Sequence, residues 1–340
     1  MRAFVIDAPG ITRIADLDRP QPGPEEVLLQ TRIVGMCGTD LSTFRGKNPL
    51  VSYPRIPGHE IAATIVETGA GVPKRFAEGM NVTLSPYTHC GHCASCKRGR
   101  VNACQFNQTL GVQRDGAMKE YFVAHWSKLY IAEGLSLAEL SIVEPLSVGF
   151  HAAARGRVLR EDTVAIIGCG VVGLGAIAAS AFRAARVIAI DVDDRKLAVA
   201  EQAGAAHLIN SRTQNIHDEL IALTDGLGPD VVIEAVGTPA TFRMAVDEVA
   251  FTGRVVYIGY AKEPVEYETR LFVMKELDIM GSRNALDEFG TVIEALRHGH
   301  FPVQSIISKV VSLDDAGDAL RAWSDDPGAF VKVQVSLDKL

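Results

Sequence analysis

The chain has 340 residues, enough for two domains, and its 47% hydrophobic content can supply a core for each. Its formal net charge of -7 comes without an acidic tail or a basic stripe, so neither nucleic acid nor an anionic membrane surface is an expected partner. Asp7 interrupts the N-terminal apolar run before it reaches the length of a secretory signal, and a cytoplasmic location is expected.

Up to about residue 127, short β-rich runs alternate with turns rich in glycine and proline. The clearest runs cover residues 26–34, 61–67 and 80–85. This pattern predicts an irregular β-rich domain with a barrel-like body. Further along, Ser136 and Glu139 have the spacing of a capping box, which predicts that a helix begins there.

Three potential metal ligands are scattered over this first part of the chain. Cys37 lies in Gly-Met-Cys-Gly-Thr-Asp, His59 in Gly-His-Glu, and Glu144 directly before a proline. Taken singly, each has an ordinary structural explanation: a buried thiol, a surface histidine in a turn, and an acid near a helix end. They indicate a metal centre only through their order and their local contexts.

Four of the six cysteines gather within fifteen residues, and they are Cys90, Cys93, Cys96 and Cys104. In a chain expected in the cytoplasm, this spacing indicates a metal site rather than disulfides, because thiols stay reduced there. Four thiolates complete the tetrahedron that zinc prefers and leave no open position, so the site is expected to be structural; His89 and His92 are not needed as ligands. An iron–sulfur cluster and simple buried thiols remain as alternatives.

From residue 163 the pattern changes to apolar runs that alternate with helix-like segments. The six runs cover 163–167, 186–190, 207–209, 230–234, 254–258 and 276–280. Together with helical stretches at 193–203 and 239–250, they predict an α/β domain, in which a doubly wound parallel sheet is covered by helices on both faces.

Two further segments need an explanation. Residues 164–182 carry no charge and are nearly long enough for a membrane helix, but glycines interrupt them. After residue 282, a helix at 287–297 and more strand-like segments follow, too many for the six-stranded sheet. We therefore expect the final part of the chain to return to the first domain.

A glycine-rich turn follows the first of the six runs. It reads Gly168-Cys169-Gly170-Val171-Val172-Gly173, fits G-x-G-x-x-G, and is followed by Asp191 at the end of the next run. In this context the glycines bring the backbone close to a pyrophosphate, and Asp191 accepts the ribose hydroxyls of NAD. The structural alternative makes Gly173 a helix-packing residue and Asp191 a helix cap. Arg195 leaves dual use of NAD and NADP open.

With these motifs in this order, the sequence resembles the zinc-containing medium-chain alcohol dehydrogenases, and among them the polyol (sorbitol-like) branch. The resemblance covers nearly the whole chain. It implies a β-rich GroES-like catalytic domain from residues 1–145 and 285–340, a Rossmann NAD-binding domain from residues 146–284, and an active site in the cleft. Relatives of this kind are commonly homotetramers or homodimers.

The resemblance also implies roles for single residues at a catalytic zinc. Cys37 and His59 are implied ligands, and Glu144 is the third where classical alcohol dehydrogenases use cysteine. Glu60 is implied as a close neighbour that binds the metal directly or through water. Whether Glu60 or Glu144 binds zinc in the resting state is left open.

Around these ligands, Asp40 is implied to orient His59, and Thr39 to pass the substrate proton outward. Many relatives carry a histidine three positions after that hydroxyl, whereas this chain has Ser42, so the later steps of the proton relay are open.

The implied substrate residues are Arg55, Arg283 and Asn284. Two arginines near one pocket suit a sugar acid or sugar phosphate better than a neutral polyol, because the guanidinium fork matches carboxylate and phosphate. Residues 52–60 and 280–285 are most similar to bacterial hexonate dehydrogenases of the L-galactonate 5-dehydrogenase type. The alternative for Arg55 is pairing with a structural acid.

The expected function is therefore hydride transfer from a secondary alcohol of a polyol or sugar acid to NAD, with one catalytic and one structural zinc ion. Other alcohols, such as threonine or a sugar phosphate, remain open as substrates. A non-catalytic NAD-binding regulatory protein on the same fold is the second hypothesis, and the joint presence of Cys37, His59 and Glu144 counts against it. A zinc-finger-like interaction module is disfavoured, because the cysteine loop offers few basic residues.

Overall fold

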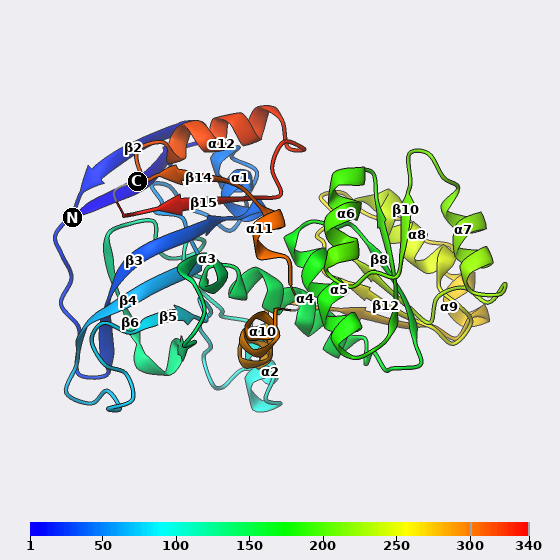
Figure 1. Cartoon of the computed structure of the whole chain (residues 1–340), viewed down its shortest axis with the longest axis horizontal. Coiled ribbons are helices and arrows are strands. Elements are labelled where there is room, and N and C mark those ends of the chain that lie inside the picture. The colour runs from blue at the N-terminus through cyan, green and yellow to red at the C-terminus, as the bar shows by residue number, and fades with distance from the viewer. Residues whose placement is uncertain (300, 339–340) are drawn as a thin grey trace. The chain divides into compact units, whose positions relative to one another are not determined.

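The computed structural model describes residues 1–299 and 301–338, which divide into two units (Figure 1). Unit 1 contains Met1–Glu144 and the segment from Val303 onward, and unit 2 is Pro145–Pro302. The sequence predicts the second boundary at residue 284. In the structure, helix α10 (Glu288–Arg297) belongs to unit 2, where Glu288 Oε1 lies 2.7 Å from His151 Nδ1 of helix α4 (Val143–Arg155).

Unit 1 is built mainly on a seven-stranded sheet with the order β14-β15-β3-β4-β5-β7, in which β6 also pairs with β3. The strands of unit 1, inside and outside this sheet, are β1 (Arg2–Ala8), β2 (Ile11–Asp16), β3 (Glu26–Met36), β4 (Glu60–Thr68), β5 (Asn81–Leu84), β6 (Tyr121–His125), β7 (Leu129–Ile131), β14 (Ile307–Ser312) and β15 (Lys332–Ser336). Its helices are α1 (Gly38–Phe44), α2 (Ala94–Lys97), η1 (Val101–Ala103), η2 (Trp126–Lys128), α3 (Leu137–Leu140), α11 (Val303–Ile306) and α12 (Ala316–Asp325).

Strand β15 shows that the final part of the chain returns to unit 1, as predicted. It lies between β14 and β3 and pairs with β3 in antiparallel register, with Val333 opposite Met36. Strands β3, β4 and β5 confirm the three predicted runs. The predicted capping box also forms, because Ser136 Oγ accepts from the backbone N of Glu139 at the start of α3. The β-rich part of the fold is therefore confirmed.

Unit 2 contains a parallel six-stranded sheet with the order β10-β9-β8-β11-β12-β13. Its strands are β8 (Thr163–Ile167), β9 (Arg186–Asp191), β10 (His207–Asn210), β11 (Val231–Glu234), β12 (Arg254–Tyr257) and β13 (Asp278–Gly281). Besides α4 and α10, its helices are α5 (Val171–Phe182), α6 (Asp194–Gln202), α7 (Ile216–Leu223), α8 (Pro239–Glu248) and α9 (Arg270–Met274). The order reverses direction between β8 and β11, which confirms the predicted doubly wound fold.

The uncharged stretch 164–182 is divided between two elements of this unit. It contains most of β8, the glycine turn and the twelve-residue helix α5. No helix in the described ranges combines the length and the apolar character needed to cross a bilayer.

Candidate functional site

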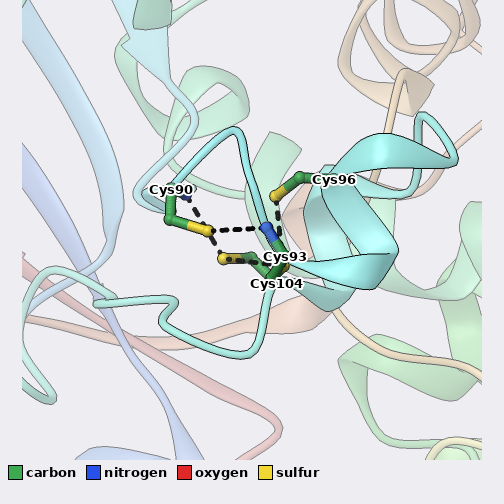
Figure 2. A group of neighbouring side chains, drawn as sticks. All are labelled: Cys90, Cys93, Cys96 and Cys104. Carbon is green, nitrogen blue, oxygen red and sulfur yellow. Dashed lines mark hydrogen bonds between the residues drawn. The ribbon is translucent and has the colours of Figure 1, made fainter.

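Four cysteines converge in one loop of unit 1 (Figure 2). Their sulfur atoms lie within 4.8 Å of one another, and all six cysteines of the chain are free thiols. Backbone amides donate to these sulfurs, among them Cys93 N to Cys90 Sγ and Phe106 N to Cys104 Sγ, both at 3.3 Å. Neither His89 nor His92 belongs to the group.

The four sulfurs lie close enough together to bind a single cation. Cys93 Sγ lies 3.5 Å from Cys96 Sγ and 3.8 Å from Cys104 Sγ. Hydrogen bonds from Ser95 and from the backbone of Cys96 lower the pKa of Cys93, whereas exclusion of water and the Cys93 thiol raise the pKa of Cys96. A divalent cation stabilises all four as thiolates, so this donor set fits a closed, tetrahedral zinc site.

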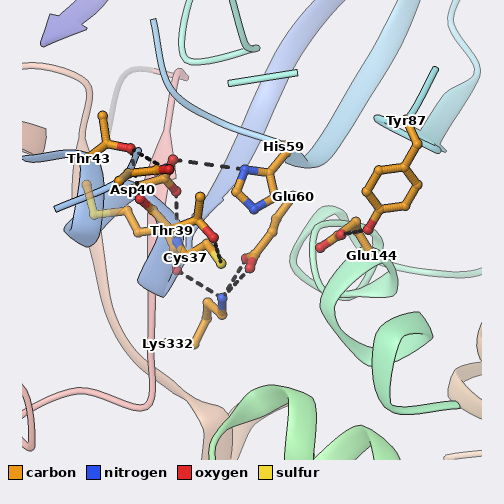
Figure 3. A network of polar contacts seen from close by, with 11 residues as sticks. Cys37, Thr39, Asp40, Thr43, His59, Glu60, Tyr87, Glu144 and Lys332 are labelled. Atoms are coloured by element: carbon orange, nitrogen blue, oxygen red, sulfur yellow. Dashed lines mark hydrogen bonds and ion pairs between the residues drawn. The ribbon is translucent and has the colours of Figure 1, made fainter. Parts of the chain in front are cut away.

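A second group of potential metal ligands combines Cys37, His59 and Glu60 (Figure 3). One ligand atom from each lies within 4.8 Å of the others. Cys37 directly precedes α1, and His59 and Glu60 lie at the start of β4. His59 and Glu60 are buried, while Cys37 is half-buried. Thiol, imidazole and carboxylate make a donor set that fits zinc.

Glu60 is fully buried and is neutralised by a lysine from a distant strand. Lys332 Nζ donates to Glu60 Oε1 at 2.7 Å and to Oε2 at 2.6 Å, and also to the carbonyl oxygen of Met36 at 2.9 Å. Burial lowers the pKa of Lys332, but the Glu60 carboxylate more than offsets this and raises it. Gly35 makes room for the pair, since a Cβ there would lie 2.0 Å from Glu60 Oε2. Sequence reasoning missed Lys332.

The imidazole of His59 lies next to Asp40. Asp40 Oδ2 accepts a hydrogen bond from the backbone N of Cys37 at 2.8 Å, while Oδ1 lies 3.9 Å from His59 Nδ1. Asp40 Oδ1 and His59 Nδ1 are buried and have no hydrogen-bond partner within the described ranges. Burial lowers the pKa of His59, but Cys37 and Asp40 raise it well above its usual value. These surroundings favour a cation, and Nε2 is left available as its ligand.

Glu144, in the first turn of α4, is turned toward Tyr87 (Figure 3). The Tyr87 hydroxyl donates to Glu144 Oε1, and both side chains are buried. Burial raises the pKa of Glu144, although the charge of His59 opposes this effect. Burial and the neighbouring Glu144 carboxylate raise the pKa of Tyr87. Glu144 is thus near the cluster, but it lies outside the group whose ligand atoms are within 4.8 Å. Tyr87 was also missed from the sequence.

The hydroxyl of Thr39 lies beside the metal cluster. Its Oγ1 is 3.7 Å from Cys37 Sγ, and its carbonyl oxygen accepts a hydrogen bond from Thr43 Oγ1 at 2.9 Å. Thr43 is fully buried and is anchored in turn by Asn48, whose Nδ2 donates to Thr43 Oγ1 at 3.1 Å. The first turns of α1 therefore hold Thr39 close to the candidate metal ligands.

The two arginines expected at the substrate belong to different units. In unit 1, Arg55 Nη1 lies 3.0 Å from Asp115 Oδ1, and Nη2 donates to Ser52 Oγ at 2.9 Å. This ion pair favours the alternative in which Arg55 pairs with a structural acid. In unit 2, Arg283 is half-buried just after β13, and Asn284 follows it with a left-handed φ of 54°.

The glycine turn of unit 2 has the backbone geometry that its sequence predicts. Gly168 has a φ of 97°, and a Cβ on Gly173 would lie 1.8 Å from the carbonyl oxygen of Gly168. Gly170, at the N-cap of α5, has no neighbouring atom within 4 Å of its added Cβ, so that side of the turn is open. Val171 and Val172 follow in the first turn of α5, where free backbone amides can receive a pyrophosphate.

Asp191 is fixed against this turn. Its Oδ2 accepts from the backbone N of Cys169 at 2.7 Å, and its Oδ1 accepts from Val192 N at 2.7 Å. Arg195, which left the use of NADP open, forms an ion pair with Asp193 at 2.7 Å. These contacts fix the Asp191 carboxylate beside the glycine turn.

Two family models match the chain. A model described as "Alcohol dehydrogenase GroES-like domain" matches residues 23–133, and one described as "Zinc-binding dehydrogenase" matches residues 171–298. The first match contains both groups of potential metal ligands but not Glu144, which belongs to neither group, and the second begins within the glycine turn.

Similar proteins cover the whole length of the chain. A sorbitol dehydrogenase of Bacillus subtilis is 33% identical over 98% of this chain and 97% of its own. An L-galactonate-5-dehydrogenase of Escherichia coli is 31% identical over 79% of each chain. A solved alcohol dehydrogenase structure from E. coli CFT073, in complex with NADH, has a TM-score of 0.91 at 29% identity and covers 99% of both chains.

Proposed function

This chain belongs to the zinc-type medium-chain alcohol dehydrogenases, and we propose that it oxidises a secondary alcohol of a sugar acid with NAD as the hydride acceptor. As a member of this family it is a zinc-dependent oxidoreductase that acts on CH–OH donors and uses a nicotinamide cofactor. The observation that carries the proposal is the grouping of Cys37, His59 and Glu60 beside the Thr39 hydroxyl.

The residues of unit 1 divide the work of alcohol oxidation. Zinc bound by the cluster supplies Lewis acidity, which makes an alcohol hydroxyl ionisable near neutral pH. Thr39 Oγ1 would accept the proton of that hydroxyl while passing its own hydroxyl proton outward, and Asp40 would keep the ring of His59 in one orientation. A bound nicotinamide would supply the hydride acceptor, and the overall oxidation of a secondary alcohol by NAD would give a ketone, NADH and a proton.

The choice of a sugar acid is supported by two observations. The similar proteins include dehydrogenases named for sorbitol and for L-galactonate, a polyol and a sugar acid. In addition, Arg283 follows the last strand of the unit 2 sheet, and its planar fork is suited to a carboxylate. Arg55 forms an ion pair with Asp115, and we assign the substrate carboxylate to Arg283 on the chemistry of its guanidinium alone.

A substrate panel tests this assignment. The purified zinc enzyme is assayed for NADH formation with hexitols, with hexonates that differ from them by one terminal carboxylate, and with hexitol phosphates. We expect a hexonate to have the highest kcat/KM. Arg283→Ala should lower kcat/KM for the hexonate by about 10- to 100-fold, because hydrogen bonds to a charged group contribute a free energy of that size. The same change should alter kcat/KM for hexitols little.

Arg283→Lys is the matched control, since it keeps the charge but loses the fork and should fall between wild type and Arg283→Ala. A preference for neutral hexitols, or an equal loss for both substrate classes in Arg283→Ala, would show that the enzyme does not select a carboxylate through this residue.

We also propose that the chain forms a homo-oligomer through the edge of the unit 2 sheet. Among the strands that the structure describes, β13 pairs only with β12, so its other edge is open. Ile279 on this strand is 40% exposed, and the preceding helix α9 exposes Val273 at 82%. An open apolar edge favours pairing with another strand, and a second copy of β13 extends the sheet across a twofold axis.

Ile279→Lys is therefore expected to shift the protein to monomers, because it places a charge in the centre of that contact. Light scattering coupled to size exclusion measures the mass. Leu227→Lys, at a site that is 76% exposed in a turn, is the control and should keep the wild-type mass. If Ile279→Lys also kept that mass, the interface would have to lie elsewhere.

A further inference from the structure

Tyr87 lies between the two candidate metal sites of unit 1. It follows β5, stands three residues before Cys90, and has only 6% of its surface exposed. Its hydroxyl donates to Glu144 Oε1 at the edge of the catalytic cluster (Figure 3). One buried side chain thus connects the start of the four-cysteine loop with a carboxylate near Cys37 and His59.

The backbone around Tyr87 is held by residues that follow the last cysteine of the loop. The carbonyl oxygen of Pro86 accepts from Leu110 N at 3.0 Å, and Thr88 Oγ1 accepts from Gln108 N at 2.7 Å. Tyr87 therefore stands between two hydrogen bonds that join the entry and the exit of the cysteine loop. Any change that separates Cys90 from Cys104 acts directly on the backbone that carries this phenol.

From these contacts we infer that Tyr87 is a positioning residue, which couples the four-cysteine metal site to the catalytic metal site by holding the carboxylate of Glu144. Metal in the cysteine loop fixes the loop ends, the loop ends fix Tyr87, and the Tyr87 hydroxyl keeps Glu144 in one orientation. The inference rests on the proposed function, because it requires a catalytic metal at Cys37, His59 and Glu60 and takes the nearby Glu144 carboxylate as a further ligand of that metal.

The affinity of the catalytic site for zinc is the first readout, measured by competition with a chromophoric chelator. Tyr87→Phe should weaken it by about 10- to 100-fold, the usual effect of losing a group that orients a metal ligand. In the Co²⁺-substituted enzyme, Tyr87→Phe should also change the visible absorption of the catalytic site. Tyr257→Phe is the control and should do neither, because the Tyr257 hydroxyl bonds to the carbonyl oxygen of Phe242 in unit 2.

A double-mutant cycle tests the coupling itself. Cys96→Ser removes a ligand from the cysteine loop and should weaken zinc binding at the catalytic site, whereas the same change in a Tyr87→Phe background should have no further effect. Fully additive effects of the two changes, or wild-type affinity in either single variant, would contradict the coupling.

If Cys96→Ser does not fold, the reciprocal measurement decides, because coupling between two sites acts in both directions. In Cys37→Ser, which lacks catalytic zinc, the cysteine loop should release its zinc faster than in wild type. Tyr87→Phe alone should raise the rate at which the cysteine loop releases zinc above that of wild type. In the Tyr87→Phe background, Cys37→Ser should then raise this rate no further. If Cys37→Ser itself kept full zinc content, the proposed function would be wrong; if it lost one ion while Tyr87→Phe bound zinc normally, only the coupling would be wrong.

Discussion

Replacing Cys37 with alanine is expected to abolish NAD reduction and to remove one of about two zinc ions per chain. The lost metal is the group that lowers the pKa of a bound hydroxyl to about 7, a drop of nearly nine units that corresponds to about 12 kcal/mol. Even if other residues compensate for half of this, the rate falls by at least about 10⁴-fold. Elemental analysis and the rate of NADH formation measure the two effects on the same sample.

Cys96→Ala is the matched cysteine substitution at the other site. It should also cost one zinc ion, but its main effect should be lower stability of the cysteine loop, because a closed four-thiolate site contributes to folding. Full activity in Cys37→Ala would refute the catalytic role of the Cys37, His59 and Glu60 cluster. Retention of both zinc ions by Cys37→Ala would refute the role of Cys37 as a zinc ligand.

Replacing Lys332 with methionine is expected to destabilise unit 1 of the zinc-free protein by about 3–5 kcal/mol, because it leaves the Glu60 carboxylate buried without a counter-charge. The side chains of Lys332 and Glu60 are 4% and 0% exposed, so water cannot replace the lysine. Both tryptophans of the chain, Trp126 and Trp323, lie in unit 1. Urea unfolding followed by tryptophan fluorescence therefore reports on this unit.

Two further variants separate the ion pair from other effects. Lys309→Met makes the same change at an exposed lysine on β14 and should alter stability by no more than about 0.5 kcal/mol. Adding Glu60→Gln to Lys332→Met removes the unpaired charge and should restore most of the stability. If Lys332→Met behaved like Lys309→Met, the Glu60–Lys332 pair would contribute nothing to the fold.

The fold of unit 2 could be predicted closely because its signals are local. Central strands of a parallel sheet are buried on both faces and read as continuous apolar runs; Thr163–Ile167 and Val231–Glu234 are buried at every position. The turn at Gly168 requires a positive φ, which explains why glycine occurs there. All six predicted runs correspond to strands within a few residues.

The residues that complete the candidate metal site could not be predicted, because they come from distant parts of the chain. Lys332, Gln334 and Ser336 alternate with valines, a pattern that normally places the polar residues in water. Here β15 lies between β14 and β3, and all five of its residues are buried. Likewise, Tyr87 is 57 residues away from Glu144 in the sequence, and no local motif connects them.

The sequence separation of Glu60 and Lys332 also sets when this pair can form during translation. The lysine is synthesised 272 residues after the glutamate, which takes roughly 15 to 50 s at about 5–20 residues per second. All of unit 2 leaves the ribosome within that interval and can fold as a contiguous segment. On the nascent polypeptide, unit 2 therefore has time to fold before the catalytic metal centre receives its last buried charge.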